Sequence, residues 1–198
     1  ALSPMVATLR GVVLLRLGDR QAADLALPSG PKVRRHLADF GALAGHLYAG
    51  VDRDFAARAR AHGGGFLVAG ADYGIGPRVP QAALALVQLG VRAILARSFV
   101  PDHRAELVRH GVLALRFAGD TDPDGLRQGD ELEIPGLPEV LEPKRPLAVR
   151  DLTRGAQFSL HHDLTLREIE MVRAGGLLGV LAAAGAGALN ATPAADPC

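Results

Sequence analysis

The stretch from Gly65 to Ser98 restricts the fold more than any other part of the chain. An apolar run at Phe66–Ala69 leads into a glycine-rich turn at 70–76, then into a helical segment starting near Pro80, and then into a second apolar run at Val91–Ala96. Short apolar runs bounded by glycine are typical of buried strands. Proline suits the first turn of a helix, where its missing N–H is no loss. The order strand, helix, strand predicts a parallel βαβ unit.

The loop Gly70–Val79, which contains the glycine-rich turn, is the predicted site. Ligands of parallel sheets bind beyond the carboxyl ends of the strands, and Gly74 and Gly76 permit close approach of the backbone. A phosphate or dinucleotide cradle is one alternative. Against it, the spacing is Gly-x-x-x-Gly-x-Gly rather than Gly-x-Gly-x-x-Gly, and no Lys-Ser/Thr pair follows the glycines.

The remaining chain supplies further strands and helices around this unit. Alternating or apolar runs predict strands at 11–17, 112–117 and 129–135, and a hairpin over 147–161. Thr165-Leu-Arg-Glu168 is a capping box that opens a last helix reaching Leu178. We therefore expect an α/β domain over residues 1–178, followed by an Ala/Gly/Pro-rich tail over residues 179–198.

Composition excludes several classes of function. The 198 residues suit one domain, and a net charge of +1 without a basic block gives no sign of nucleic-acid binding. No run reaches the roughly 18 apolar residues of a membrane span. The only cysteine is Cys198, so the chain forms no internal disulfide and cannot bind an iron–sulfur cluster by itself. This cysteine content predicts a cytoplasmic location.

Two groups of polar residues mimic reactive sites. His161-His162-Asp163 resembles a metal-binding group, but adjacent residues of a strand face opposite ways, so we predict no metal there. Glu131 and Glu133 share one face of a predicted strand, where solvated carboxylates are expected.

A family resemblance covers roughly Val12 to Leu178. The residues that carry it are Ala69-Gly70, Tyr73-Gly74-Ile75-Gly76, Ser98-Phe99, His103-Arg104, the run Gly111–Phe117, Gly129–Pro135, and Gly18, Asp19, Asp24, Pro28 and Gly30 of an earlier loop. In this order they resemble the swivelling domain of the aconitase and 3-isopropylmalate dehydratase superfamily. The last two thirds are more similar to the bacterial aconitase type than to the isopropylmalate dehydratase small subunit.

The resemblance implies a fold and a partner. The expected fold is the aconitase-type swivelling β/β/α domain, with a central, mostly parallel sheet flanked by helices and a β-hairpin. The expected reaction is the dehydration or hydration of a di- or tricarboxylic hydroxy acid. The 4Fe-4S cluster would lie on a partner domain or large subunit, with no cofactor on this chain.

The resemblance also nominates residues. It implies a catalytic role for Asp24 and substrate binding by Gly74, Gly76, Arg78 and His103. Arg35 lies two residues from the position of a substrate-gripping arginine, which is Leu37 in an ungapped alignment. Two of these residues also have a structural interpretation. Asp24 fits a turn that bonds its own backbone, and His103 fits a capping or core hydrogen-bond role.

The chain departs from the family at its reactive motif. Pro77, Arg78 and Val79 stand where the family has Ser-Ser-Arg. Proline has no hydroxyl to act as a base, and losing a general base typically costs about 10²–10⁴-fold in rate. Two hypotheses follow: a hydro-lyase domain with altered chemistry or substrate, or a catalytically degenerate domain kept as a carboxylate-binding, structural or regulatory module. The sequence leaves enzymatic activity open.

Overall fold

The computed structural model describes residues 4–22, 40–76, 79–118 and 125–189. Within these ranges the strands are β1 (Leu9–Arg16), β2 (Gly65–Ala69), β3 (Val91–Ala96), β4 (Leu113–Phe117), β5 (Glu131–Ile134), β6 (Leu147–Asp151) and β7 (Ala156–His161). The helices are α2 (Phe40–Ala44), α3 (Phe55–His62), α4 (Val79–Gln88), α5 (Pro101–Arg109), α6 (Leu137–Val140), α7 (Leu166–Arg173) and α8 (Leu177–Leu189).

The predicted βαβ unit is confirmed as β2, α4 and β3. Gly65–Ala69 is buried at every residue, as expected for a strand covered on both faces. β2 pairs in parallel with β3, and Gly90 ends the intervening turn with a φ of 74°. The predicted hairpin is also confirmed, since β6 and β7 pair antiparallel from Leu147↔Leu160 to Asp151↔Ala156.

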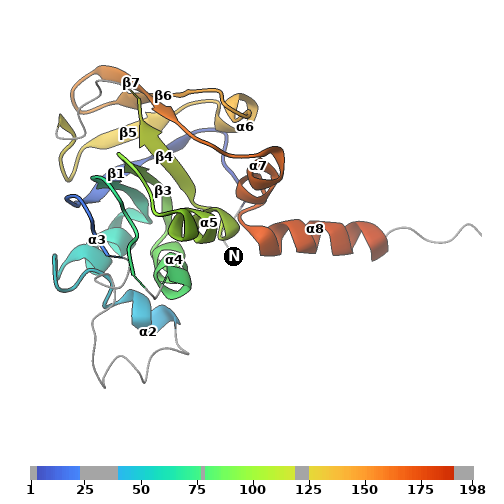
Figure 1. Cartoon of the computed structure of the whole chain (residues 1–198), viewed down its shortest axis with the longest axis horizontal. Coiled ribbons are helices and arrows are strands. Elements are labelled where there is room, and N and C mark those ends of the chain that lie inside the picture. The colour runs from blue at the N-terminus through green and yellow to red at the C-terminus, as the bar shows by residue number, and fades with distance from the viewer. Residues whose placement is uncertain (1–3, 23–39, 77–78, 119–124, 190–198) are drawn as a thin grey trace, which may run out of the picture.

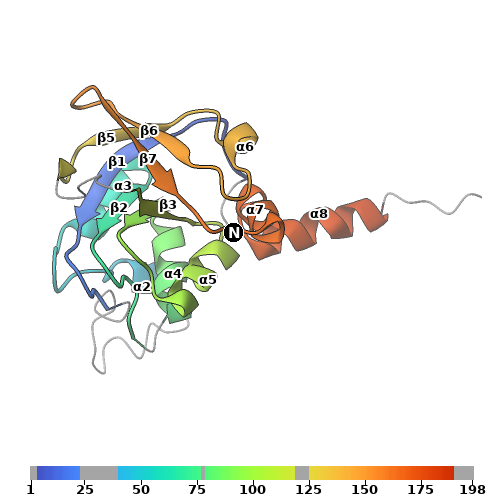
Figure 2. The same ribbon diagram turned by 45° about the horizontal axis from the view of Figure 1, so that its top comes forward.

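The seven strands of the described chain close into a barrel in the order β1-β2-β3-β4-β7-β6-β5. The pairings β1–β2, β2–β3 and β3–β4 are parallel. The other four, β4–β7, β7–β6, β6–β5 and β5–β1, are antiparallel. Figure 2 shows β5, β6 and β7 on the side opposite α2, α4 and α5.

The predicted central, mostly parallel sheet is therefore wrong in its closure and in its proportions. The hairpin does not flank the sheet, because β7 pairs with β4 and β6 pairs with β5, which itself pairs with β1. Each strand in this circle has two neighbours, so no open edge is left to pair with another chain.

Two apolar clusters stabilise the barrel. One lies between the parallel strands and helices α2 to α5, and includes Leu14, Leu67, Ile94 and Leu86. The other fills the barrel and extends to α6 and α7, with Phe66, Leu95, Leu132 and Leu147 among its members. The parallel strands contribute to both clusters, which explains their long apolar runs.

The predicted last helix is two helices. The capping box at Thr165 and Glu168 opens α7 as expected, but Gly175 and Gly176 take φ values of 78° and 113° and end it. Both glycines pack against the turn at Gly111, where an added Cβ would lie 2.6 Å from the carbonyl carbon of Gly175. α8 then continues at 81° to α7 and projects from the barrel (Figure 1).

Candidate functional site

The carboxyl ends of β1, β2 and β3 meet at one edge, where backbone hydrogen bonds join their loops. The N–H of Gly70, after β2, donates to the carbonyl of Gly18, after β1, at 3.1 Å. The N–H of Arg97, after β3, donates to the carbonyl of Gly70, also at 3.1 Å. The glycine-rich turn thus lies between two neighbouring loops, at the position where parallel sheets bind ligands.

Asp19 joins the first loop to the start of the glycine-rich turn. Its Oδ1 accepts a hydrogen bond from the N–H of Ala71 at 2.8 Å. A Cβ on Gly70 would lie 2.0 Å from the same oxygen, so only glycine permits this approach. Arg97 adds a longer ion pair, with 3.7 Å between its Nη1 and Asp19 Oδ1. The Gly18-Asp19 match to the family therefore has a structural reason.

Ser98 holds the middle of the turn, a role that the sequence did not reveal. Its Oγ accepts from the N–H of Asp72 at 2.7 Å and donates to Asp72 Oδ1 at 3.1 Å. Its carbonyl accepts from the N–H of Tyr73 at 3.0 Å. Asp72 has a φ of 53°, which a short polar side chain tolerates better than most. A polar residue directly after a buried strand was the available signal.

Below the turn lies a buried aromatic group formed by Tyr48, Tyr73 and His103. The two tyrosine hydroxyls are 2.5 Å apart, and burial raises the pKa of both phenols. The Tyr73 and His103 rings meet edge to face, with centroids 5.1 Å apart. His103 is 0% exposed, and no described group hydrogen-bonds to either ring nitrogen. Burial lowers its pKa to about 4, so the ring is neutral near pH 7.

Gly74 packs directly on this histidine. Its φ is 98°, and an added Cβ would lie 2.3 Å from Cδ2 of His103. Its N–H donates to the carbonyl of Gln21 at 2.9 Å. The structure thus brings together two of the predicted site residues, Gly74 and His103, with the imidazole behind the loop and away from solvent. This burial agrees with the core role considered for His103, and its predicted role in substrate binding stays a prediction.

Gly76 lies at the end of the described part of the turn, with a φ of 120°. Ile75, beside it, forms a parallel bridge to Ala22 of the first loop. Asp24, Arg35 and Arg78 lie outside the described residues, so their predicted roles stay predictions.

The apparent reactive groups elsewhere are engaged in structural contacts. Glu131 pairs with Arg10 at 2.7 Å and Glu133 with Arg150 at 3.0 Å. His162 is buried, and its Nδ1 accepts from the N–H of Leu164 at 3.3 Å. Among the described residues, no group of three or more His, Cys, Asp or Glu side chains is placed to hold a metal ion.

Within the same ranges, no single helix is long and apolar enough to cross a membrane. Counted together, α7 and α8 would be long and apolar enough by length and composition alone, but they are bent by 81° relative to each other.

Comparison with known proteins identifies relatives of the whole barrel. The family model of the aconitase C-terminal domain matches residues 49–120. A 3-isopropylmalate dehydratase small subunit from Pyrobaculum calidifontis is 32% identical over 164 residues, which cover 83% of this chain and 91% of that protein. Aconitate hydratase A of Pseudomonas aeruginosa is 43% identical over 119 residues, covering 57% of this chain and 13% of that enzyme.

The chain therefore matches only about one seventh of the length of the first aconitases with which it aligns. A solved structure, the 3-isopropylmalate dehydratase of Methanocaldococcus jannaschii, superimposes with a TM-score of 0.74 at 24% identity, covering 93% of this chain and 99% of that one. This likeness supports the fold. With the near full-length match to a small subunit, it shows that the chain belongs to the aconitase and 3-isopropylmalate dehydratase superfamily, as a domain of the small-subunit and aconitase C-terminal type.

Proposed function

We propose that this chain is the swivelling domain of an aconitase-type hydro-lyase that acts with a cluster-bearing partner domain or subunit. The observation that carries the proposal is the match to a small subunit over 91% of that protein's length. Such a domain contributes side chains and backbone donors to a site that it shares with its partner. The proposed substrate is a small di- or tricarboxylic hydroxy acid.

The chain's own donors agree with a cluster held elsewhere. Cys198 is its only cysteine, whereas an iron–sulfur cluster needs several thiolate ligands. When bound by the partner, the cluster would supply a Lewis acid for the departing hydroxyl. This chain would supply the anion-binding loop. A cytoplasmic location stays a prediction from cysteine content.

Within this proposal the loop binds a ligand at its carboxyl end, near Gly76, because the N–H groups of residues 70–74 already donate to acceptors within the protein. Gly74 and Gly76 both take positive φ values, which glycine adopts without steric cost. Arg78 adds a positive charge next to these glycines, where a guanidinium can bind a carboxylate through two hydrogen bonds. His103 positions Gly74 from below.

The second candidate is a catalytically degenerate domain that binds carboxylates without proton transfer. Pro77 and Val79 favour it, because neither replaces the hydroxyl or the charge of the family's Ser-Ser-Arg. Asp24 is the carboxylate that the family resemblance assigns to the active site. We propose it as the catalytic residue of the first candidate, and Arg35 as a further carboxylate ligand.

One experiment separates the two candidates. The chain is mixed with a cluster-loaded isopropylmalate dehydratase large subunit, and hydration of the unsaturated acid is followed by absorbance. Calorimetric titrations with citrate, isocitrate and 3-isopropylmalate are run in parallel. Turnover that Asp24→Asn abolishes supports the hydro-lyase. Binding that Arg78→Ala abolishes, without turnover, supports the degenerate domain. If neither turnover nor binding is seen with the partner, both candidates are wrong.

A further inference from the structure

A cavity of about 320 Å³ lies outside the glycine-rich turn and has no part in the function proposed above. It is bounded by the segment that follows β3, by β4, by the start of α5 and by the segment that follows β7. Pockets that enclose small organic ligands begin at roughly this volume, about 300 Å³. Its lining residues include Ser98, Phe99, Arg104, Arg116 and Asp163.

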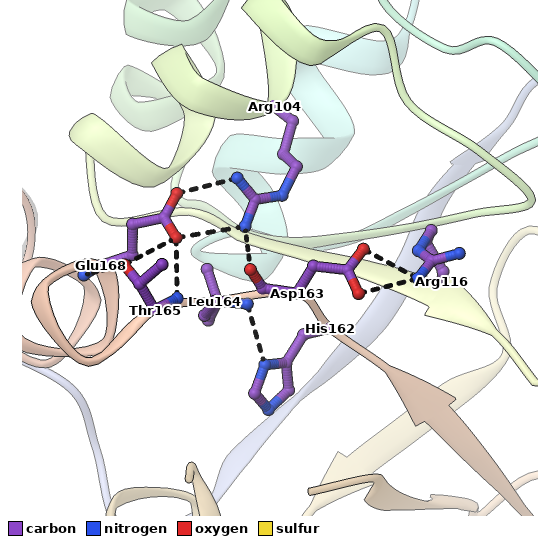
Figure 3. Close-up of polar contacts among 7 residues, drawn as sticks. All are labelled: Arg104, Arg116, His162, Asp163, Leu164, Thr165 and Glu168. Carbon is purple, nitrogen blue, oxygen red and sulfur yellow. Dashed lines mark hydrogen bonds and ion pairs between the residues drawn. The ribbon is translucent and has the colours of Figure 1, made fainter. Parts of the chain in front are cut away.

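Arg104 is held in place by an ion pair with Glu168, which offsets much of its charge. Its Nη1 donates to Glu168 Oε1 at 2.8 Å, and its Nη2 donates to the carbonyl of Asp163 at 2.9 Å (Figure 3). Glu168 is itself held by the N–H of Thr165 at 2.8 Å. These contacts, with a longer one of 3.4 Å from Nη2 to Glu168 Oε2, orient the guanidinium through its two Nη atoms and do not use Nε. Arg104 is therefore preorganised rather than free to leave the cavity wall.

Arg116 carries an exchangeable partner. Only its Nη2 contacts Asp163, at 2.9 Å from Oδ1 and 2.8 Å from Oδ2. The two side chains are 43% and 63% exposed, and solvent-exposed ion pairs of this kind contribute little to stability. A ligand carboxylate can take the place of Asp163 and use two nitrogens of the guanidinium, which is the stronger geometry.

The surroundings favour an organic anion. α5 begins at Pro101, and its N-cap residue, Val100, makes no side-chain capping bond, so the positive end of the helix dipole is uncapped by a side chain. Asp102, exposed in the first turn, opposes this field in part. Phe99 gives the cavity an apolar wall, which suits a carbon skeleton between two charged ends.

We propose that this cavity binds a small dicarboxylate. One carboxylate replaces Asp163 on Arg116, and the other accepts a hydrogen bond from Nε of Arg104, which the contacts to Glu168 and Asp163 do not use. The proposal rests on the geometry of the cavity and is independent of the reactive motif at 77–79.

The test is calorimetric titration of the full chain with succinate and malonate, with acetate and inorganic phosphate as comparison anions. We expect Arg116→Gln to weaken dicarboxylate binding about tenfold or more, as loss of a charge-assisted pair does. Asp163→Asn removes the competing carboxylate and should tighten binding by about threefold or more. Tighter binding on deletion of a native contact is not expected if Asp163 is merely structural.

The matched control is Arg150→Gln. Arg150 is a strand arginine of comparable exposure, 54%, that pairs with Glu133 and does not line the cavity, so its loss should leave affinity unchanged. Arg78→Ala should also preserve binding here while abolishing that of the glycine-rich turn. No dicarboxylate binding, equal binding by Arg116→Gln, or equal affinity for acetate or phosphate would overturn the proposal. If Arg116→Gln does not fold, the Asp163→Asn comparison decides.

Discussion

At the scale of single residues, the loop depends on the contact between Gly74 and His103. Gly74→Ala would place a Cβ 2.3 Å from the imidazole, on a backbone with a φ of 98°. Because both the backbone and the packing are then strained, we expect a loss of about 2–4 kcal/mol in the free energy of unfolding. Urea denaturation at neutral pH measures it.

The control for this substitution is Gly155→Ala. Gly155 also has a positive φ, 68°, but no atom lies within 4 Å of the Cβ position. Its replacement should cost only about 1 kcal/mol, through backbone strain. Equal losses in the free energy of unfolding at the two positions would show that the contact with His103 does not restrict residue 74.

The burial of His103 predicts a dependence of stability on pH. Its pKa falls from 6.5 to about 4 on folding, because burial disfavours the charged ring. The unfolded chain therefore binds the proton more tightly. The resulting contribution of His103 to the free energy of unfolding is fully present above pH 6.5. It is lost as the pH falls from 6.5 towards 4, by up to about 3 kcal/mol.

The measurement is urea unfolding of wild type and His103→Gln at pH 7, 6 and 5. Burial also lowers the pKa of His110 and His162, which add slopes of the same sign. The difference in pH dependence between wild type and His103→Gln isolates the contribution of His103. The exposed His62→Gln serves as the control. Parallel pH profiles for wild type and His103→Gln would mean that His103 titrates alike in both states.

At the scale of elements, Arg154 ties the hairpin to β5. Its guanidinium lies 2.7 Å from Asp130 and 2.8 Å from Asp151, whose side chains are only 7% and 3% exposed. Arg154→Met would leave two nearly buried carboxylates without their cation. We expect a loss of about 2–3 kcal/mol, below the full cost of breaking a buried pair because the arginine is partly exposed.

Thermal or urea unfolding checks this prediction. The matched control is Arg145→Met, whose ion pair with Glu142 is half exposed on both sides and should contribute about 0.5 kcal/mol or less. Equal losses for Arg154→Met and Arg145→Met would contradict this explanation.

At the scale of the whole molecule, α8 contributes little to the barrel. Residues 181–186 are all exposed, and Leu178 and Leu181 are 65% and 57% exposed. We expect a chain that ends at Leu178 to unfold within about 1 kcal/mol of the full chain, since exposed side chains contribute little. A chain that ends at Thr165 loses the buried Ile169 and Val172 and should be several kcal/mol less stable. Comparable stability of the two truncations would refute the predicted boundary at residue 178.

Local patterns were sufficient to predict most elements. The apolar runs predicted β2 and β3, Gly90 predicted the end of α4, and the capping box predicted the start of α7. The break at Gly175 and Gly176 was missed. A glycine within an apolar helical pattern is tolerated, and only the contact with Gly111 requires the positive φ seen here.

The sequence by itself determined the family, the βαβ unit and the position of the glycine-rich turn, because these depend on residues that are neighbours along the chain. Only the tertiary structure decided that the sheet closes, that His103 lies beneath Gly74 and that Arg104 and Arg116 share a cavity. Each of these joins segments far apart in sequence. Strand pairing partners and side-chain burial depend on the packing of the whole barrel, and no local periodicity encodes them.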